Sequence, residues 1–375
     1  MRKVYLDHAA TTPVKPEVLE AMLPYFSEFY GNAASVYELG RQSKKAIEAA
    51  REAIARNFGA EAKEIFFTAS GTEADNWVIK GLAWVNQAKG KHIITSQIEH
   101  HAILHSCQFL ETQGFEVTYL PVDHEGLVAP ADLAKAIRQD TILVSIMMAN
   151  NEVGTIQPIL ELAKIAKKAQ VFFHTDAVQA VGNLSINVKE LGLDALSFSG
   201  HKFGAPKGIG GLYLRSGVKI DNLLHGGSQE RDLRGGTHNV AGIVGMAKAL
   251  ELATANLEQR RAHLLALRER TITEIMQLAP QAKLNGHRVH RLPGNVNFSF
   301  PGLEGDVLLM QLDMKGIAAS SGSACSALSI EPSHVLTAMG LQADLAKSAL
   351  RLTFGEDNTS EDVDYLLATL KEILA

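Results

Sequence analysis

Short apolar runs alternate with amphipathic stretches through the first two-thirds of the chain, and this alternation narrows the possible folds more than any other feature. The amphipathic stretches have the spacing of helices. Strand–helix alternation predicts an α/β fold, with a mostly parallel sheet covered by helices on both faces. Such sheets bind ligands beyond the carboxyl ends of their strands. The apolar runs predict strands at 64–69, 91–96, 115–122, 141–150, 171–177 and 193–200.

The pattern changes after about residue 240. A nearly uninterrupted helical stretch covers 240–279 and ends near Pro280, and a closing helix is expected at 361–374. Between them, a second alternating section includes apolar runs at 294–300, 306–316 and 349–354. We therefore expect a large domain over 15–257 and a smaller α/β domain formed by 1–14 and 258–375, joined by the long helix.

Composition excludes several classes of protein. A chain of 375 residues is long for a single core, and 46% hydrophobic with 21% charged residues is typical of a globular protein. The net charge of −5, without a long basic run, argues against direct nucleic-acid or membrane binding. Two cysteines cannot form a disulfide framework. With no signal peptide or membrane span apparent, we expect a cytoplasmic protein.

A lysine follows the last predicted strand of the first section. In "LSFSGHKFGAPKGIGGLYL" (196–214), the strand is expected to end at Ser199, and Lys202 stands in a glycine-rich turn without an acidic neighbour in sequence. A lysine partly removed from water can attack a carbonyl as a neutral amine, which a Schiff-base lysine must do. An ordinary surface lysine in a turn would show the same local pattern.

Two other strand ends carry polar groups. In "FTASGTEADN" (67–76), Gly71 and Thr72 begin a helix, where backbone N–H groups can bind a phosphate, although a simple helix cap fits equally well. In "FFHTDAVQ" (172–179), Asp176 follows a hydrophobic strand, a costly place for a carboxylate unless it meets a cation. A protonated pyridine nitrogen would be such a cation, and a helix cap is again the alternative.

A histidine occupies another strand end, in "SQIEHHAILH" (96–105). The imidazole of His100 could stack there on a flat cofactor. His101 and His105 have the i,i+4 spacing of metal ligands, but no third ligand follows, so a zinc site is the less favoured interpretation. The strand ends of one sheet thus offer a lysine, a carboxylate, a phosphate cradle and an imidazole. This combination indicates pyridoxal 5′-phosphate as cofactor, and no metal.

The motifs resemble those of a known family. Eight motifs stand in the order found in class-V aminotransferases, and within these in cysteine desulfurases of the NifS/IscS type. They are "YLDHAATTP", "SGTEADN", "EHHA", "NNEVGTIQP", "HTDAVQ", "SFSGHKFGAPKGIGGLY", "RGGTHN" and "SSGSAC". The resemblance covers nearly the whole chain. It implies the pyridoxal-phosphate-dependent transferase fold, of the aspartate aminotransferase-like type I. His8 and Tyr37 stand where relatives commonly have asparagine and histidine.

The resemblance also implies a role for each matched residue. Lys202 would hold the cofactor, Asp176 would pair with the pyridine nitrogen, and Gln179 would bond the ring hydroxyl. His100 would stack on the ring and move protons. Arg351 would bind the substrate carboxylate with help from Asn32, and Asn151 would lie near cofactor and substrate. The phosphate would be held by Gly71, Thr72, Ser199 and His201, and by Thr237 reaching into the partner's site of a homodimer.

Cys325, within "SSGSACSALS" (320–329), matches the catalytic cysteine of the family. Its thiolate would take sulfur from L-cysteine, leaving L-alanine and a persulfide for an acceptor protein of iron–sulfur cluster assembly or tRNA thiolation. Cys107 lies in a helical pattern and is expected to be an ordinary buried cysteine. The alternatives are a selenocysteine lyase, another class-V aminotransferase or lyase, or a non-catalytic sulfur carrier.

Overall fold

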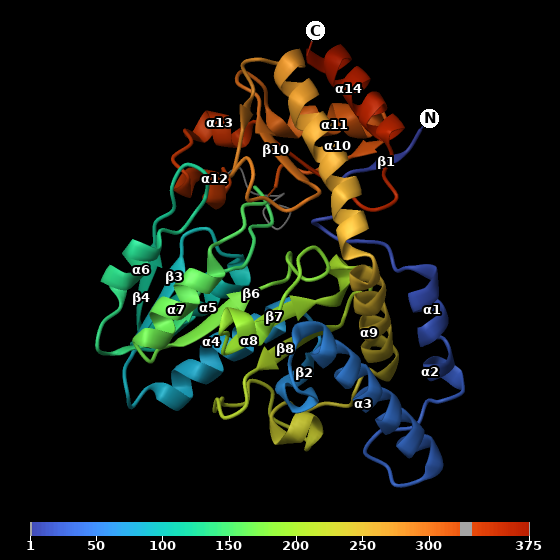
Figure 1. Cartoon of the computed structure of the whole chain (residues 1–375), viewed down its shortest axis with the longest axis vertical. Coiled ribbons are helices and arrows are strands. Elements are labelled where there is room, and N and C mark those ends of the chain that lie inside the picture. Colours follow the sequence, from blue (N-terminus) through green and yellow to red (C-terminus); the bar gives the residue numbers. More distant parts are fainter. Residues whose placement is uncertain (1, 323–331, 375) are drawn as a thin grey trace.

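A computed structural model describes residues 2–322 and 332–374, so Cys325 lies outside the described residues (Figure 1). The strands are β1 (Val4–Tyr5), β2 (Ile65–Thr68), β3 (His92–Ser96), β4 (Glu116–Leu120), β5 (Thr141–Ser145), β6 (Phe172–Asp176), β7 (Ala195–Ser199), β8 (Gly210–Leu214), β9 (Lys283–Leu284), β10 (Asn295–Ser299), β11 (Ile317–Ala318) and β12 (Ala349–Thr353). 

The helices of the first 255 residues are α1 (Pro16–Met22), α2 (Pro24–Ser27), α3 (Glu38–Phe58), α4 (Gly71–Asn86), α5 (His101–Thr112), α6 (Pro130–Ala136), α7 (Ile159–Lys168), α8 (Val188–Leu191) and α9 (Val240–Ala255). Those that follow are α10 (Leu257–Leu278), α11 (Gly305–Met314), α12 (His334–Ala338), α13 (Ala343–Lys347) and α14 (Ser360–Leu374). Three short 3₁₀ turns are η1 (Ala62–Glu64), η2 (Gly200–Lys202) and η3 (Gln229–Asp232).

The main sheet has seven strands in the order β2-β8-β7-β6-β5-β3-β4. Only β8 runs antiparallel to its neighbours, and the other pairings are parallel. The predicted α/β fold with a mostly parallel sheet is confirmed, and each of the six predicted strands contains an observed one. The parallel strands bring the carboxyl ends of β6 and β7 to one edge, which is where their connections place the polar residues.

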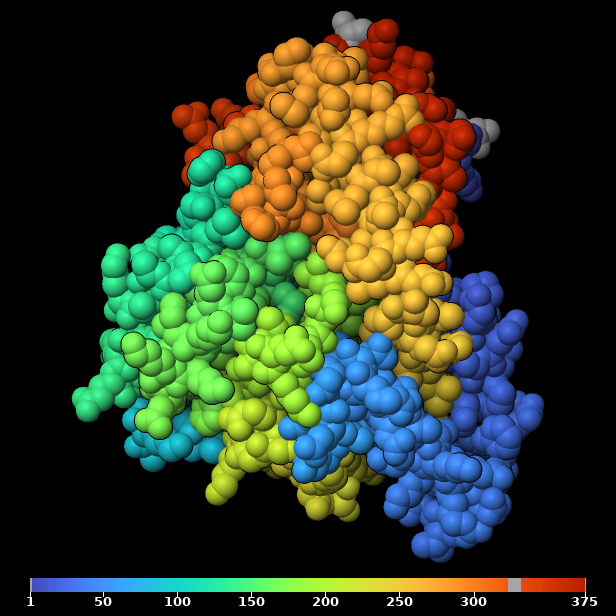
Figure 2. All heavy atoms as spheres, in the orientation of Figure 1, coloured from blue at the N-terminus to red at the C-terminus, as the bar shows by residue number. Residues whose placement is uncertain are grey.

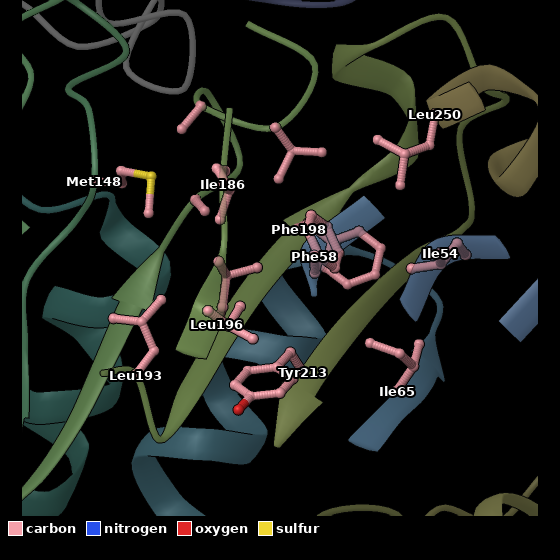
Figure 3. Close-up of a cluster of buried hydrophobic side chains, with 14 of the residues drawn as sticks. Ile54, Phe58, Ile65, Met148, Ile186, Leu193, Leu196, Phe198, Tyr213 and Leu250 are labelled. Atoms are coloured by element: carbon pink, nitrogen blue, oxygen red, sulfur yellow. The ribbon is translucent and has the colours of Figure 1, made fainter. Parts of the chain in front are cut away.

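The core beneath this edge is aromatic and aliphatic (Figure 3). Phe58 of α3 and Phe198 of β7 pack edge to face, with ring centroids 5.2 Å apart at an interplanar angle of 66°. Both side chains are almost fully buried. Burying an aromatic ring stabilises a fold by roughly 1.5–3 kcal/mol, so α3 is fixed firmly against the sheet from which the site residues project.

A second part of the molecule surrounds a smaller antiparallel sheet of β12, β10 and β9. The N-terminal strand β1 belongs to this second part of the molecule, because Val4 pairs in parallel with Ile317 of β11 in a separate two-stranded sheet. Leu6 is buried in the same cluster as Phe298 and Leu366. Figure 1 accordingly shows the N- and C-terminal ends of the chain close together above the main sheet.

The prediction of one long helix over 240–279 is wrong in one respect, because the helix is broken at Asn256. There φ and ψ are −123° and 38°, outside the helical region, and α9 and α10 meet at a bend of 72°. α9 packs beside the main sheet, whereas α10 continues to the smaller sheet, and its side chains cover the junction on the face shown in Figure 2. Among the described residues, no single helix is long and apolar enough to cross a membrane. Only the bent pair of α9 and α10, taken together, has the length and composition of a membrane span.

Candidate active site

A cavity of about 300 Å³ lies where the carboxyl ends of β6 and β7 meet the first turns of α4 and α5. This is the place at which an open α/β sheet is expected to bind its ligand. The predicted site residues that line it are Gly71, Thr72, His100, Asn151, Asp176, Gln179, Ser199, His201, Lys202 and Arg351.

Lys202 reaches across the cavity floor to the N-terminal segment. Its Nζ donates to the carbonyl oxygens of Ala9 at 2.6 Å and Ala10 at 2.8 Å. Gln179 donates its amide Nε2 hydrogen to the same Ala9 oxygen at 2.9 Å. The segment that follows β1 therefore forms one wall of the site, and it orients both the lysine and the glutamine.

Asp176, at the end of β6, and Asp75 are two of the three buried acids that line the cavity, and Glu152 is the third. Asp176 accepts a hydrogen bond from the Val178 N–H at 2.8 Å, while Asp75 has one oxygen, Oδ1, without a hydrogen-bond partner among the described residues. Burial raises the pKa of both carboxyls, and for Asp75 the charge of Asp176 raises it further. Val178 and Lys202 oppose the shift at Asp176, so Asp75 is the acid that keeps its proton and Asp176 the carboxylate that can face a cationic nitrogen.

His174 lies beneath this pair of acids and is itself neutral. Its ring nitrogens contact the hydroxyls of Ser145 and Ser197, each at 2.9 Å, and burial lowers its pKa to about 3. Its Nε2 is 3.9 Å from Asp75 Oδ1. His174 therefore supplies no positive charge to either acid.

His100 is the N-cap of α5. Its Nδ1 accepts the backbone N–H of Ala102 at 3.1 Å, so a neutral ring carries its proton on Nε2. Burial, followed by the positive charge of Lys202, lowers the pKa of His100 to about 4. The imidazole is thus neutral at physiological pH and can both stack on a flat ring and exchange a proton.

The first turn of α4 forms an anion cradle. Ser70 caps the helix by accepting the Glu73 N–H at 3.1 Å, which leaves the N–H groups of Gly71 and Thr72 without intrahelical partners. A Cβ atom at Gly71 would lie 2.7 Å from Val178 Cγ2. The alternative of a helix cap is thus also correct, but it involves Ser70 and leaves the residues of the cradle available.

Arg351, from β12, closes the cavity on the opposite side. It is 1% exposed, pairs with Asp7 at 2.7 Å, and donates to the carbonyl oxygen of Gly322 at 2.8 Å. Its Nε is buried without a hydrogen-bond partner among the described residues. This guanidinium is the strongest cation available for a carboxylate at this wall.

Glu152, which the sequence analysis did not single out, is a further wall residue. Its carboxylate accepts the hydroxyl of Ser333 at 2.6 Å, and a Cβ atom placed on Gly322 would be 3.0 Å from its Oε2. Gly322 and Ser333 stand on either side of the 323–331 segment that contains Cys325. An acid two residues after the expected strand at 141–150 was the available signal, and it is similar to the signal that pointed to Asp176.

Thr237 and Asn32 do not line the Lys202 cavity as the structure describes it. They lie together in a different cavity of about 270 Å³, beside Tyr30 and Ala241. Their predicted roles at the phosphate and the substrate carboxylate therefore stay predictions.

The loop that leads to Thr237 has an unusual backbone. Glu230, Arg231 and Asp232 have φ of 47°, 59° and 65°, a left-handed conformation that costs an ordinary residue about 1–2 kcal/mol. The Glu230 carboxylate holds this turn by accepting from Arg51 and His238, each at 2.8 Å. Burial opposes ionisation, but these donors outweigh it and lower the pKa of Glu230 to about 2.

The histidine pair considered for zinc meets a third ring in the fold. The ring of His101 lies 4.9 Å from that of His105 and 4.7 Å from that of His334, between centroids. The described residues contain no group of three or more His, Cys, Asp or Glu side chains arranged to hold a metal ion. Cys107 is fully buried, and burial raises its pKa to about 12, in agreement with the expected structural cysteine.

The residues present fit pyridoxal 5′-phosphate. The N–H groups at Gly71 can bind a phosphate. Asp176 is a buried carboxylate that can face a protonated ring nitrogen, and the neutral imidazole of His100 can stack on the face of that ring. Lys202 lines the same cavity.

Comparisons with known proteins show the family to which the chain belongs. The family model described as aminotransferase class-V matches residues 4–366. A cysteine desulfurase IscS of Methanosarcina thermophila is 58% identical over 373 residues, covering 100% of this chain and 92% of that protein. Among solved structures, a NifS-like protein is 41% identical with a TM-score of 0.94, covering 100% of this chain and 99% of that one.

A further solved structure, SspA in complex with cysteine, is 38% identical with a TM-score of 0.84 and covers 95% of this chain and 100% of that one. These similarities extend over the whole length of the chain and include both of its parts. The fold is that of the pyridoxal-phosphate-dependent transferases of type I. The chain belongs to the class-V aminotransferase family.

Proposed function

We propose that this chain is a cysteine desulfurase, which converts L-cysteine into L-alanine and leaves a persulfide on Cys325. One observation carries the proposal: Gly322 and His334, which bracket the segment containing Cys325, line the same cavity as Lys202. The relatives named above support it, since one is a cysteine desulfurase and another was solved with cysteine.

Pyridoxal 5′-phosphate, when bound, supplies an electron-poor ring that stabilises negative charge on the substrate carbon. Lys202 would hold it covalently, with Gln179 at its ring hydroxyl. Asp176 would keep its ring nitrogen protonated, because a buried carboxylate favours a neighbouring cation. The phosphate would be held by Gly71, Thr72, Ser199 and His201.

Lys202 and His100 would handle the protons. With Nδ1 occupied by the Ala102 N–H, His100 can exchange a proton only through Nε2, which fixes the direction of transfer. Because its pKa is about 4, the ring is neutral and does not repel the Lys202 ammonium that forms when the lysine takes the α-proton.

Arg351 would bind the α-carboxylate of the substrate, with Asn151 beside it. At present the guanidinium is held by Asp7 and by the Gly322 carbonyl oxygen. A substrate carboxylate would compete with these acceptors, so binding of substrate and the position of Gly322 are connected through one side chain.

The sulfur step would use the thiolate of Cys325, since the thiolate is the nucleophile. It attacks the sulfur of the bound cysteine, so that an S–S bond forms and the substrate Cβ–S bond breaks. The electron pair of the broken bond remains on Cβ, which is protonated, and L-alanine leaves. The persulfide then passes its outer sulfur to an acceptor thiol on a protein of iron–sulfur cluster assembly or tRNA thiolation.

We also propose a homodimer in which Thr237 completes the partner's phosphate site. The placement of Thr237 and Asn32 in a separate cavity supports this, because that cavity could face a second copy. The domain division at 14/15 and 257/258 is supported by the burial of Val4 and Leu6 among residues of the C-terminal third. A cytoplasmic location follows from the need to keep Cys325 reduced.

The direct test is incubation of the cofactor-loaded protein with L-cysteine and a reductant, measuring alanine and sulfide together. We expect equal amounts of both products. Cys325→Ser should keep the cofactor absorbance and bind L-cysteine while forming no persulfide, and Cys107→Ala is the matched control that should retain full turnover. Formation of a keto acid instead of alanine would indicate a transaminase and contradict the proposal.

A further inference from the structure

A second cavity, of about 100 Å³, lies next to the active-site cavity and shares Ala9, Gln179 and Lys202 with it. It is located at the junction between the two parts of the molecule. Phe203 contributes to its wall from the turn after β7, and Leu264 contributes from α10. No role in the proposed desulfurase reaction requires this second space.

Arg260 projects into this cavity from the first turn of α10, just beyond the bend at Asn256. Its Nε and Nη2 atoms are buried and have no hydrogen-bond partner among the described residues. By contrast, buried Arg51 is paired with Glu230 at 2.8 Å. Buried guanidinium nitrogens without a partner are destabilising, and these two atoms therefore indicate a site for an anion.

Glu356, the acid whose charge acts on Arg260, is already paired with a lysine. Burial lowers the pKa of Arg260, and Glu356 opposes that shift only through its charge, because its carboxylate is paired with Lys15 at 2.5 Å. Glu356 and Asp357 are exposed residues of the cavity lining. The cavity thus offers two buried guanidinium nitrogens of Arg260 at one wall and, toward solvent, the Lys15–Glu356 pair and the carboxylate of Asp357.

The rest of the lining is mixed. It includes the polar or charged side chains of Lys15, Gln179, Asn183 and Lys202, and an apolar patch of Leu264, Leu292 and Phe354, which are all largely buried. A ligand that satisfies all three features carries a carboxylate, an ammonium group and a short side chain. A planar carboxylate also matches the paired N–H donors of a guanidinium.

We propose that this cavity binds a small α-amino acid, with its carboxylate on Arg260 and its ammonium group toward Asp357. The site adjoins the catalytic cavity, with which it shares Ala9, Gln179 and Lys202, and the proposal does not depend on the desulfurase reaction. Because residues of both parts line it, an amino acid bound there would hold the two parts in their present arrangement and would contact the segment at Ala9 that orients Lys202.

The test is equilibrium dialysis of the cofactor-loaded protein against labelled L-alanine. Alanine can also enter the catalytic cavity, so we expect two molecules per chain in the wild type. Arg260→Gln should lose one of them, through a weakening of about tenfold or more. Arg270→Gln is the matched control, because Arg270 lies on the same helix, pairs with Glu274 and does not line the cavity, and it should retain both.

One alanine per chain in the wild type, or two in Arg260→Gln, would overturn the proposal. Competition with acetate and with ethylamine tests the identity of the ligand. Acetate displacing the second alanine at equal concentration would show a simple carboxylate site and contradict the amino acid. Should Arg260→Gln fail to fold, Asp357→Asn at the exposed end provides an independent measurement, with an expected weakening of about threefold.

Discussion

The hydroxyl of Ser333 is bonded to the carboxylate of Glu152 at 2.6 Å, and this contact joins the residue after the Cys325 segment to the wall of the Lys202 cavity. The same hydroxyl caps α12 by accepting the Leu336 N–H at 3.2 Å. One oxygen atom therefore fixes both the end of the segment and the start of the helix that follows.

Ser333→Ala should slow sulfide release about tenfold while leaving cofactor absorbance and binding of L-cysteine unchanged. Losing the hydroxyl leaves a buried oxygen of Glu152 unsatisfied, at a cost of about 1–3 kcal/mol. Steady-state sulfide production and cofactor spectra measure the two effects. Ser348→Ala removes a comparable buried hydroxyl, bonded to the Leu345 carbonyl oxygen, and should not affect turnover. Equal losses in both variants would mean a general effect on stability.

Glu99→Gln should alter how stability depends on pH. Burial raises the pKa of Glu99 from 4.5 to about 8. The protonated form is therefore fully stabilising below pH 4.5, and that contribution is lost as the pH rises toward 8, by about 1.4 kcal/mol per unit. Glutamine has no such proton to lose, so wild-type stability should fall relative to Glu99→Gln between pH 5 and 8.

Denaturant unfolding at several pH values measures this difference. Exposed Glu161 offers a control, because Glu161→Gln should follow the wild-type curve. Parallel curves for wild type and Glu99→Gln would show that Glu99 ionises normally in the fold.

His100→Ala should reduce exchange of the α-proton of L-alanine with solvent deuterium by about 10² or more. The neutral imidazole lines the same cavity as Lys202 and can relay a proton, and its low pKa predicts no change in this exchange rate near pH 6.5 in the wild type. Proton NMR of the recovered alanine gives the rate without requiring Cys325. A wild-type rate that changes sharply near pH 6.5 would contradict a neutral His100.

Gly71→Ala should weaken retention of the cofactor about five- to a hundredfold. The added methyl group would lie 2.7 Å from Val178 Cγ2, and overpacking of this kind costs about 1–3 kcal/mol. Fluorescence titration with pyridoxal 5′-phosphate measures the affinity. Val178→Ala in the same chain should restore most of it, since it removes the atom that the new Cβ meets. Failure of this rescue would place the effect elsewhere.

Local pattern was sufficient for most of the fold and for much of the site. Six strands, the parallel sheet and the strand-end positions of Ser199, Asp176 and His100 follow from periodicity, because connections of a parallel sheet emerge at one edge. The break at Asn256 was not predictable in this way, since the apolar spacing continues across it and only packing against two separate sheets bends the helix.

Contacts between distant segments were also beyond the sequence. Arg351 pairs with Asp7, 344 residues away, and Glu152 meets Ser333 across 181 residues. The sequence around Asp7 or Glu152 does not predict which residue each acid contacts, because these contacts depend on how the two parts of the molecule meet. The unpaired state of Arg260 likewise appears only once its surroundings are known.

The left-handed turn at Glu230, Arg231 and Asp232 has a consequence for how fast two copies could associate. The monomer already holds this turn in shape through Arg51 and His238, so the loop before Thr237 does not need to become ordered when a partner arrives. A preorganised surface loses little conformational entropy on docking. Encounter and mutual orientation, and not folding of the loop, would then set the rate at which dimers form.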